Sequence, residues 1–175
     1  MSFLNGTMAF FYNLIFHKEE HMKKFFIAGI VAAFAMQFAQ AATVCDAKTS
    51  LNDARSNLVA MVGLSDKKAE DGGGEEVLNT LREKVNTATT SLETAIKTLA
   101  DENSEGAAAI VVATLDKTWS EFKGTRESEI MPNVYSGKKA EAKIIATGVQ
   151  KERMSIMNDS ISKLGGDSCE EAAAE

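Results

Sequence analysis

Apolar residues recur every three or four positions along one stretch of this chain, and this spacing limits the fold more firmly than any other feature. Seven such positions stand in register: Leu78, Leu81, Val85, Ala88, Leu92, Ala95 and Leu99. Glu, Lys, Asn and Thr occupy the other faces. A three-and-four alternation places all seven side chains on one narrow stripe of an α-helix, where neighbouring helices can bury them. The spacing therefore predicts a long amphipathic helix through residues 78–99.

Three further windows show helical spacing. The first contains Val44, Ala47, Leu51, Ala54, Leu58 and Met61. The third contains Val112, Leu115, Trp119 and Phe122, with Arg126 at the next position of the stripe. The fourth contains Ala142, Ile145, Val149, Ile156 and Leu164 on one line, with Met154, Met157 and Ile161 beside it. Together the windows predict four helices.

Turn-forming residues separate the four windows. Charged residues and three glycines in 66–74 interrupt the first pattern before the second begins. Ser104 is placed to cap the third helix, because its hydroxyl could accept a hydrogen bond from a free backbone N–H. Pro132 lacks a backbone donor and predicts an end or a kink within residues 131–135. Gly165-Gly166 can adopt a left-handed conformation and predicts the end of the fourth helix.

The predicted fold class is all-α, because no window alternates with period two. Four helices with short links pack as antiparallel neighbours, which predicts an up-down-up-down four-helix bundle over residues 42–169 and a disordered tail over 170–175. In that topology Cys45 and Cys169 lie at the same end of the bundle, and we expect them to form a disulfide that closes it. Two free thiols are the alternative.

A bacterial export signal is predicted over residues 22–41. Lys23 and Lys24 follow Met22, an uncharged stretch runs over 25–38, and Ala39-Gln40-Ala41 has the small residues of a cleavage site. We therefore expect a periplasmic protein that is cleaved after Ala41 and keeps no stable membrane span.

Two alternatives concern the amino-terminal region. Residues 25–44 are uncharged and long enough to span a bilayer, so a retained anchor is the alternative to cleavage. A signal rarely begins so far into a chain, and we expect residues 1–21 to be an upstream extension from a start codon placed too early. A genuine long signal is the alternative.

Charge and histidine content exclude several classes of function. After residue 41 the chain holds 16 basic and 23 acidic residues, without the basic cluster that binding to nucleic acid requires. Both histidines, His17 and His21, precede the predicted signal. Their position excludes His-ligated metal or haem and Ser-His or Cys-His catalytic pairs from the mature protein. We expect no catalytic, metal or cofactor site.

A series of loose motifs runs through residues 117–164. They are Trp119-Ser-Glu-Phe122, Arg126, Ile130-Met-Pro132, Tyr135-Ser-Gly137, Glu141-Ala142, Thr147-Gly148 and Glu152-Arg153. This order resembles the latter half of the four-helix-bundle sensor domain of methyl-accepting chemotaxis receptors. Those receptors continue into a second membrane span and a signalling coiled coil, and neither follows the matching segment here.

The resemblance implies a free-standing, exported, non-enzymatic sensor domain. Its expected partners are a small acidic ligand or a membrane sensor protein, and the family's domains dimerise through their first helix. A structural or chaperone-like interaction protein in the periplasm is the alternative.

Arg126, Arg153 and Trp119 are the candidate ligand-binding residues. Both arginines occupy or border apolar stripes, where a guanidinium needs an anionic partner because an unpaired buried charge is costly. They could bind a carboxylate ligand, with Trp119 at the floor of the pocket. In the interpretation that we favour, they pair with internal carboxylates at positions 127, 129 and 152 or extend their charged groups to water, and Trp119 lies in the core.

Overall fold

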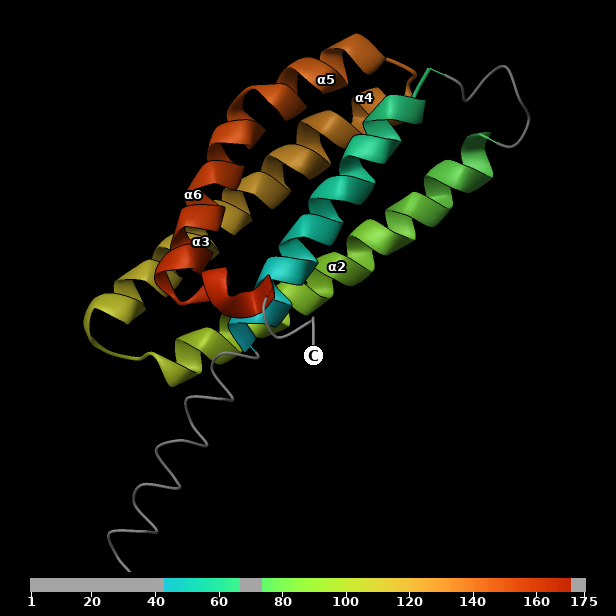
Figure 1. The fold of residues 1–175 in the computed structure, drawn as a ribbon. Helices are drawn as coiled ribbons and strands as arrows, with labels where there is room; N and C mark the ends of the chain where they lie inside the picture. Colours follow the sequence, from blue (N-terminus) through green and yellow to red (C-terminus); the bar gives the residue numbers. More distant parts are fainter. Residues whose placement is uncertain (1–42, 67–73, 171–175) are drawn as a thin grey trace, which may run out of the picture. The chain divides into compact units, whose positions relative to one another are not determined.

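Helices account for nearly all of residues 43–66 and 74–170, the parts of the chain that the computed structural model describes (Figure 1). The elements are a first helix over 43–64, α2 (Gly74–Glu102), α3 (Gly106–Thr125), the π turn η1 (Arg126–Ile130), α4 (Met131–Tyr135), α5 (Lys139–Thr147), α6 (Val149–Lys163) and the 3₁₀ turn η2 (Gly166–Glu170). No described residue lies in a strand, which confirms the all-α class. The predicted extension 1–21, the predicted signal 22–41 and residues 171–175 of the predicted tail lie outside the described residues.

The elements group into four helical segments. The first helix and α2 are the first two, and α3, η1 and α4 follow one another without interruption as the third. α5 and α6 form the fourth, on either side of Gly148. Within the described residues, no helix combines the length and the apolar character that a membrane crossing requires.

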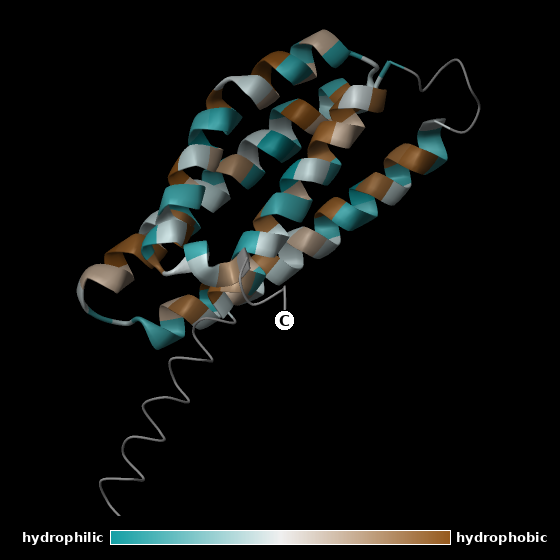
Figure 2. Ribbon diagram, in the orientation of Figure 1, coloured by the Kyte–Doolittle hydropathy of each residue, from teal (hydrophilic) through white to brown (hydrophobic). Residues whose placement is uncertain are grey.

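The first three segments bury the stripes that their spacing predicts. All six apolar positions of the first helix are buried, and so are those of α2 apart from the partly buried Leu81. The stripe of α3 is buried as far as Arg126. Figure 2 shows polar residues interspersed with apolar ones along each helix, as an amphipathic pattern requires. The buried apolar side chains of these stripes belong to one continuous core.

The fourth segment departs from its predicted stripe. Gly148 has φ −90° and ψ −111°, so the helix stops at Thr147 and starts again at Val149. The break rotates the buried face: Val149 is 42 % exposed and Ile156 is 44 % exposed. The neighbouring line of Met154, Met157 and Ile161 is buried instead. The prediction of one line through Val149 and Ile156 is therefore wrong, because it assumed an unbroken helix.

A π turn precedes the proline of the third segment. The N–H of Met131 bonds to the carbonyl of Arg126, five residues earlier. Pro132 lies in the first turn of α4, which continues directly from the π turn. α4 ends at Tyr135, as predicted, and Gly137 follows with φ +73°, a conformation that favours glycine.

The predicted cap of the third helix is wrong. The N-cap position of α3 is Glu105, not Ser104, and no side chain caps it. At the preceding helix end, the Asn103 side chain donates to the carbonyl of Leu99 at 2.8 Å. The short link 103–105 is therefore fastened to α2 rather than to α3.

The two ends of the first helix contact the last part of the chain. Cys45 forms the predicted disulfide with Cys169, with a Cα–Cα distance of 5.3 Å. Beside it, Lys48 donates to the carbonyl of Gly166 at 3.0 Å. Asp66, just beyond the other end, pairs with Lys139 of α5 at 3.1 Å. The predicted disulfide is therefore confirmed.

Candidate functional site

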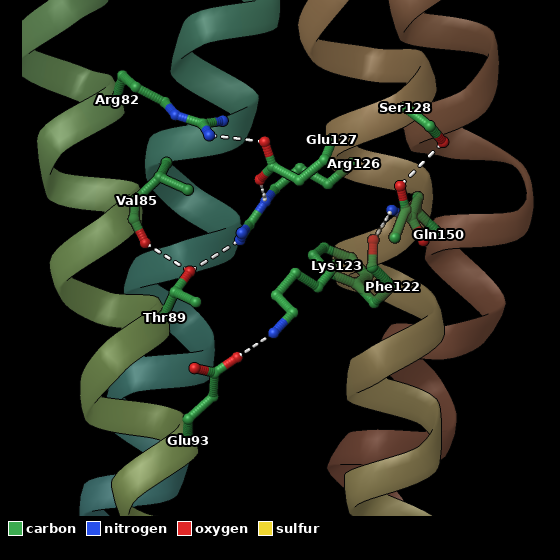
Figure 3. Close-up of polar contacts among 11 residues, drawn as sticks. Arg82, Val85, Thr89, Glu93, Phe122, Lys123, Arg126, Glu127, Ser128 and Gln150 are labelled. Carbon is green, nitrogen blue, oxygen red and sulfur yellow. Dashed lines mark hydrogen bonds and ion pairs between the residues drawn. The ribbon is translucent and has the colours of Figure 1, made fainter.

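Arg126, the first candidate residue, lies at the start of the π turn and is only 2 % exposed. Its Nε donates to Oε1 of Glu127 at 2.7 Å, and its Nη1 donates to the hydroxyl of Thr89 on α2 at 2.9 Å (Figure 3). That hydroxyl in turn donates to the carbonyl of Val85 at 2.7 Å. Burial lowers the pKa of Arg126, and the hydrogen bond and charge of Glu127 oppose this shift. Arg126 thus has an internal carboxylate partner, one of those that the sequence predicts.

Glu127 joins two helices by accepting from two arginines. Arg82 of α2 donates to Oε2 at 2.6 Å while Arg126 holds Oε1. Partial burial acts to raise the pKa of Glu127, but the hydrogen bonds and charges of the two guanidinium groups outweigh it. The pKa of Glu127 is therefore lowered from its usual 4.5.

Replacement of Glu127 by Gln is expected to cost about 1 kcal/mol of unfolding free energy at pH 7, because 39 % of the side chain is exposed and solvent screens the pair. The folded-state pKa lies below the unfolded one, so the carboxylate stabilises the fold above about pH 4.5. This stabilisation is lost as the pH falls through the folded-state pKa.

Urea titrations of both proteins at pH 7 and at pH 3, followed by circular dichroism, measure the difference. It should shrink at pH 3. Glu129→Gln is the matched control, because Glu129 is exposed and makes no ion pair within the described residues. A loss of stability that is the same at both pH values would contradict the ion-pair role.

Trp119, the second candidate, belongs to the core. It is 2 % exposed and stacks on Phe122, with ring centroids 5.5 Å apart and an interplanar angle of 15°. The guanidinium carbon of Arg126 lies 5.6 Å from the Trp119 ring centroid, within range of a cation–π interaction. The indole Nε1 is buried and has no hydrogen-bond partner among the described residues.

Arg153, the third candidate, lies between α3 and α6. Its Nη1 donates to the hydroxyl of Thr125 at 2.7 Å and to Oε1 of Gln150 at 3.1 Å. Its Nε lies 3.6 Å from a carboxylate oxygen of Glu121. Gln150 is 2 % exposed and donates to the carbonyl of Phe122 at 2.8 Å.

The structure brings Trp119 and Arg126 together and places Arg153 in separate contacts. Both arginines have carboxylate partners, which meets the need for an anion that the sequence identified. A ligand-binding role for these three residues stays a prediction.

A cleft lies between the first helix and the α5–α6 segment, with a volume of about 550 Å³. This size falls within the range of about 300–1,000 Å³ that is common for small-molecule sites. Its walls include Leu58 and Val62 from the first helix, Met154 from α6 and Phe122 from α3, all of which are buried core residues. Two segments far apart in the sequence thus enclose an apolar surface.

Basic side chains supply all the formal charge of this cleft. Four of its thirteen lining residues are cationic and none is acidic: Arg55, Lys139, Lys143 and Lys151. This concentration contrasts with the net charge of −6 of the whole chain. Lys139 is paired with Asp66, whereas the other three make no ion pair within the described residues.

The sequence contains one feature that points to this cleft, and the sequence analysis did not identify it. Lys139 and Lys143 are four residues apart and therefore share a face of α5. Arg55 and Lys151 come from other helices, and only the folded chain brings them to the same cleft.

A second groove, of about 590 Å³, lies between α2 and α3 and includes Trp119 in its lining. Its charged residues have both signs, and Lys123 is paired with Glu93 across it (Figure 3). Because these charges compensate one another, this groove has less to offer a charged ligand than the cleft does.

Comparisons with known proteins add no family to these observations. No protein-family model, no curated protein and no solved structure matches this chain. Among the described residues, no cluster of His, Cys, Asp and Glu side chains could hold a metal ion.

Proposed function

We propose that this chain is a non-enzymatic, sensor-like binding module of the bacterial periplasm, and that the cleft beside α5–α6 is its ligand site. The observation that carries the proposal is the cleft itself: it has apolar walls, and three of its four cations make no ion pair within the described residues, which is an arrangement suited to a ligand. The resemblance to chemotaxis-receptor sensor domains supports the same class of function.

An antiparallel up-down-up-down bundle is the proposed topology. The disulfide links the start of the first helix to η2, which follows the fourth segment, and Asp66, just beyond the other end of the first helix, pairs with Lys139 at the start of the fourth segment. In an antiparallel pair, the start of each helical segment lies beside the end of the other, as these contacts require. The short link 103–105 is also typical of antiparallel neighbours in a bundle.

The periplasm is the proposed compartment, reached by a signal over residues 22–41 that is cleaved after Ala41. Disulfides persist in oxidising compartments outside the cytoplasm, and Cys45–Cys169 supports that placement. Val44, three residues after the proposed cleavage site, is buried in the core, so cleavage there would leave the described core intact.

Binding of the neutral apolar dye Nile red tests the proposed site. We expect its fluorescence to rise with the wild-type protein purified from a secreting bacterial host. Ala146→Trp should remove this rise, because Ala146 lines the cleft and a bulkier side chain would fill it. A thermal-shift screen with organic acids and amino acids should give stabilising compounds that the same variant no longer recognises.

Ala109→Trp is the matched control, since Ala109 lines the groove between α2 and α3. If the wild type binds neither the dye nor any compound, the proposed function is wrong. If Ala109→Trp and not Ala146→Trp removes binding, the ligand site is wrong.

A structural or chaperone-like interaction protein is the second candidate. Three exposed apolar residues on the fourth segment favour it: Ile144, Val149 and Ile156. Val149 and Ile156 are two turns apart on α6 and share one face. Capture of unfolded outer-membrane proteins, lost on Val149→Gln with Ile156→Gln, would favour this function. Homodimerisation through the first helix and docking to a membrane sensor protein also stay proposals.

A further inference from the structure

The charges around the cleft identify a class of ligand. We infer that the cleft binds an amphipathic organic anion, with its carboxylate at the exposed edge and its hydrocarbon chain inside. This inference rests on the proposed function.

The rim selects the sign of the ligand's charge. Arg55, Lys143 and Lys151 are exposed, line one cleft and have no carboxylate partner within the described residues. Three cations around one apolar hollow repel each other, and an anion placed among them removes this repulsion. A cationic amphiphile would add to it, so the cleft discriminates between head groups of opposite sign.

The apolar residues of the cleft favour a ligand with a hydrocarbon chain. Leu58, Val62 and Met154 present hydrocarbon to the cleft, and the flexible thioether of methionine adapts to ligands of different shape. Val59 also lines the cleft and is 55 % exposed. A hydrocarbon chain that covered this surface would remove it from water, which is favourable in proportion to the area covered. A small polar anion such as acetate gains nothing from this floor.

The polar groups of the cleft that are available to a ligand lie among its exposed residues, and this sets the orientation of the ligand. Gln150 lines the cleft, but its amide is held by the carbonyl of Phe122 and by Arg153. The cations without carboxylate partners all lie at the exposed rim. The carboxylate therefore stays near solvent while the hydrocarbon chain points inward.

Isothermal titration of the secreted protein with three probes tests this inference. We expect decanoate to bind about tenfold more tightly than decyltrimethylammonium, on the basis of about threefold for each of two or three exposed charge pairs. Acetate should give no heat of binding at the same concentrations. Added salt should weaken binding of decanoate, because salt screens exposed charges.

Matched substitutions locate the binding. Lys143→Gln combined with Lys151→Gln should weaken decanoate binding about tenfold, whereas Lys84→Gln on α2, also exposed and outside the cleft, should not. Val59→Gln should weaken binding through the loss of apolar surface. Val77→Gln is its control, because Val77 is 47 % exposed on α2 and does not line the cleft.

The outcomes distinguish failure of the anionic ligand class from failure of the proposed binding function. If both amphiphiles bind equally, or the lysine pair can be replaced without effect, the anionic class is overturned while the binding module stands. If Nile red binds and decanoate does not, the anionic class is again overturned. If neither binds, and no compound of the thermal-shift screen binds, the proposed function fails as well.

Discussion

Replacement of Cys45 and Cys169 by serine is expected to lower the unfolding free energy by about 4 kcal/mol. The disulfide closes a loop of 124 residues in the unfolded chain, and long loops lose the most entropy on cross-linking. Without the bond, the unfolded state gains conformational freedom while the helices keep their packed stripes. For a domain of this size the melting temperature should fall by on the order of 10 °C.

Thermal unfolding followed by circular dichroism at 222 nm, with and without reductant, measures this loss. Reductant should lower the melting temperature of the wild type to that of the double serine variant and leave the variant unchanged. The far-ultraviolet spectrum of the folded variant should remain helical. A melting temperature that reductant does not change would show that the bond does not restrict the unfolded chain.

Truncation of Trp119 to alanine is expected to cost about 4 kcal/mol, the usual range for a large buried aromatic side chain. The indole is 2 % exposed, stacks on Phe122 and lies beneath the guanidinium of Arg126. Its removal leaves a cavity between helices and takes the aromatic face away from a buried charge. Urea titration by circular dichroism is the appropriate measurement, because the substitution removes the chain's single tryptophan and its fluorescence.

Trp119→Phe is the informative control for the same site. A phenyl ring keeps an aromatic face for Phe122 and Arg126, and it lacks the indole Nε1 that has no partner in the described structure. We expect this change to cost about 1 kcal/mol, well below the alanine substitution. If alanine costs no more than phenylalanine, Trp119 is not a packing residue and its proposed role in a ligand pocket gains support.

The helices of the first three segments were predictable because their information is local. A residue's place on a helix depends only on its distance along the chain, so spacing alone identified most of the buried positions of the first helix, α2 and α3. The pairing of Cys45 with Cys169 was also predictable, because these two cysteines lie just inside the start and just after the end of the four helical windows, and the predicted antiparallel topology would bring those positions together. Even the need of Arg126 for an anion followed from its place on an apolar stripe.

The fourth segment could not be predicted in the same way. Gly148 is compatible with a helix interior at a modest cost, so nothing local required the helix to stop there. A single break changes the angular position of every later residue, which is why Val149 and Ile156 are exposed while Met154 and Met157 are buried.

The sequence by itself determined the helical class, three buried stripes and the disulfide. Only the tertiary structure decided the buried face of α6, the pairing of Glu127 with Arg82 and of Arg153 with Glu121, and the cleft lined by Arg55, Lys143 and Lys151. The physical reason is the range of the interactions. Helix periodicity depends on neighbours three and four residues away, whereas a cleft and an ion pair depend on side chains that only folding brings within a few ångströms of one another.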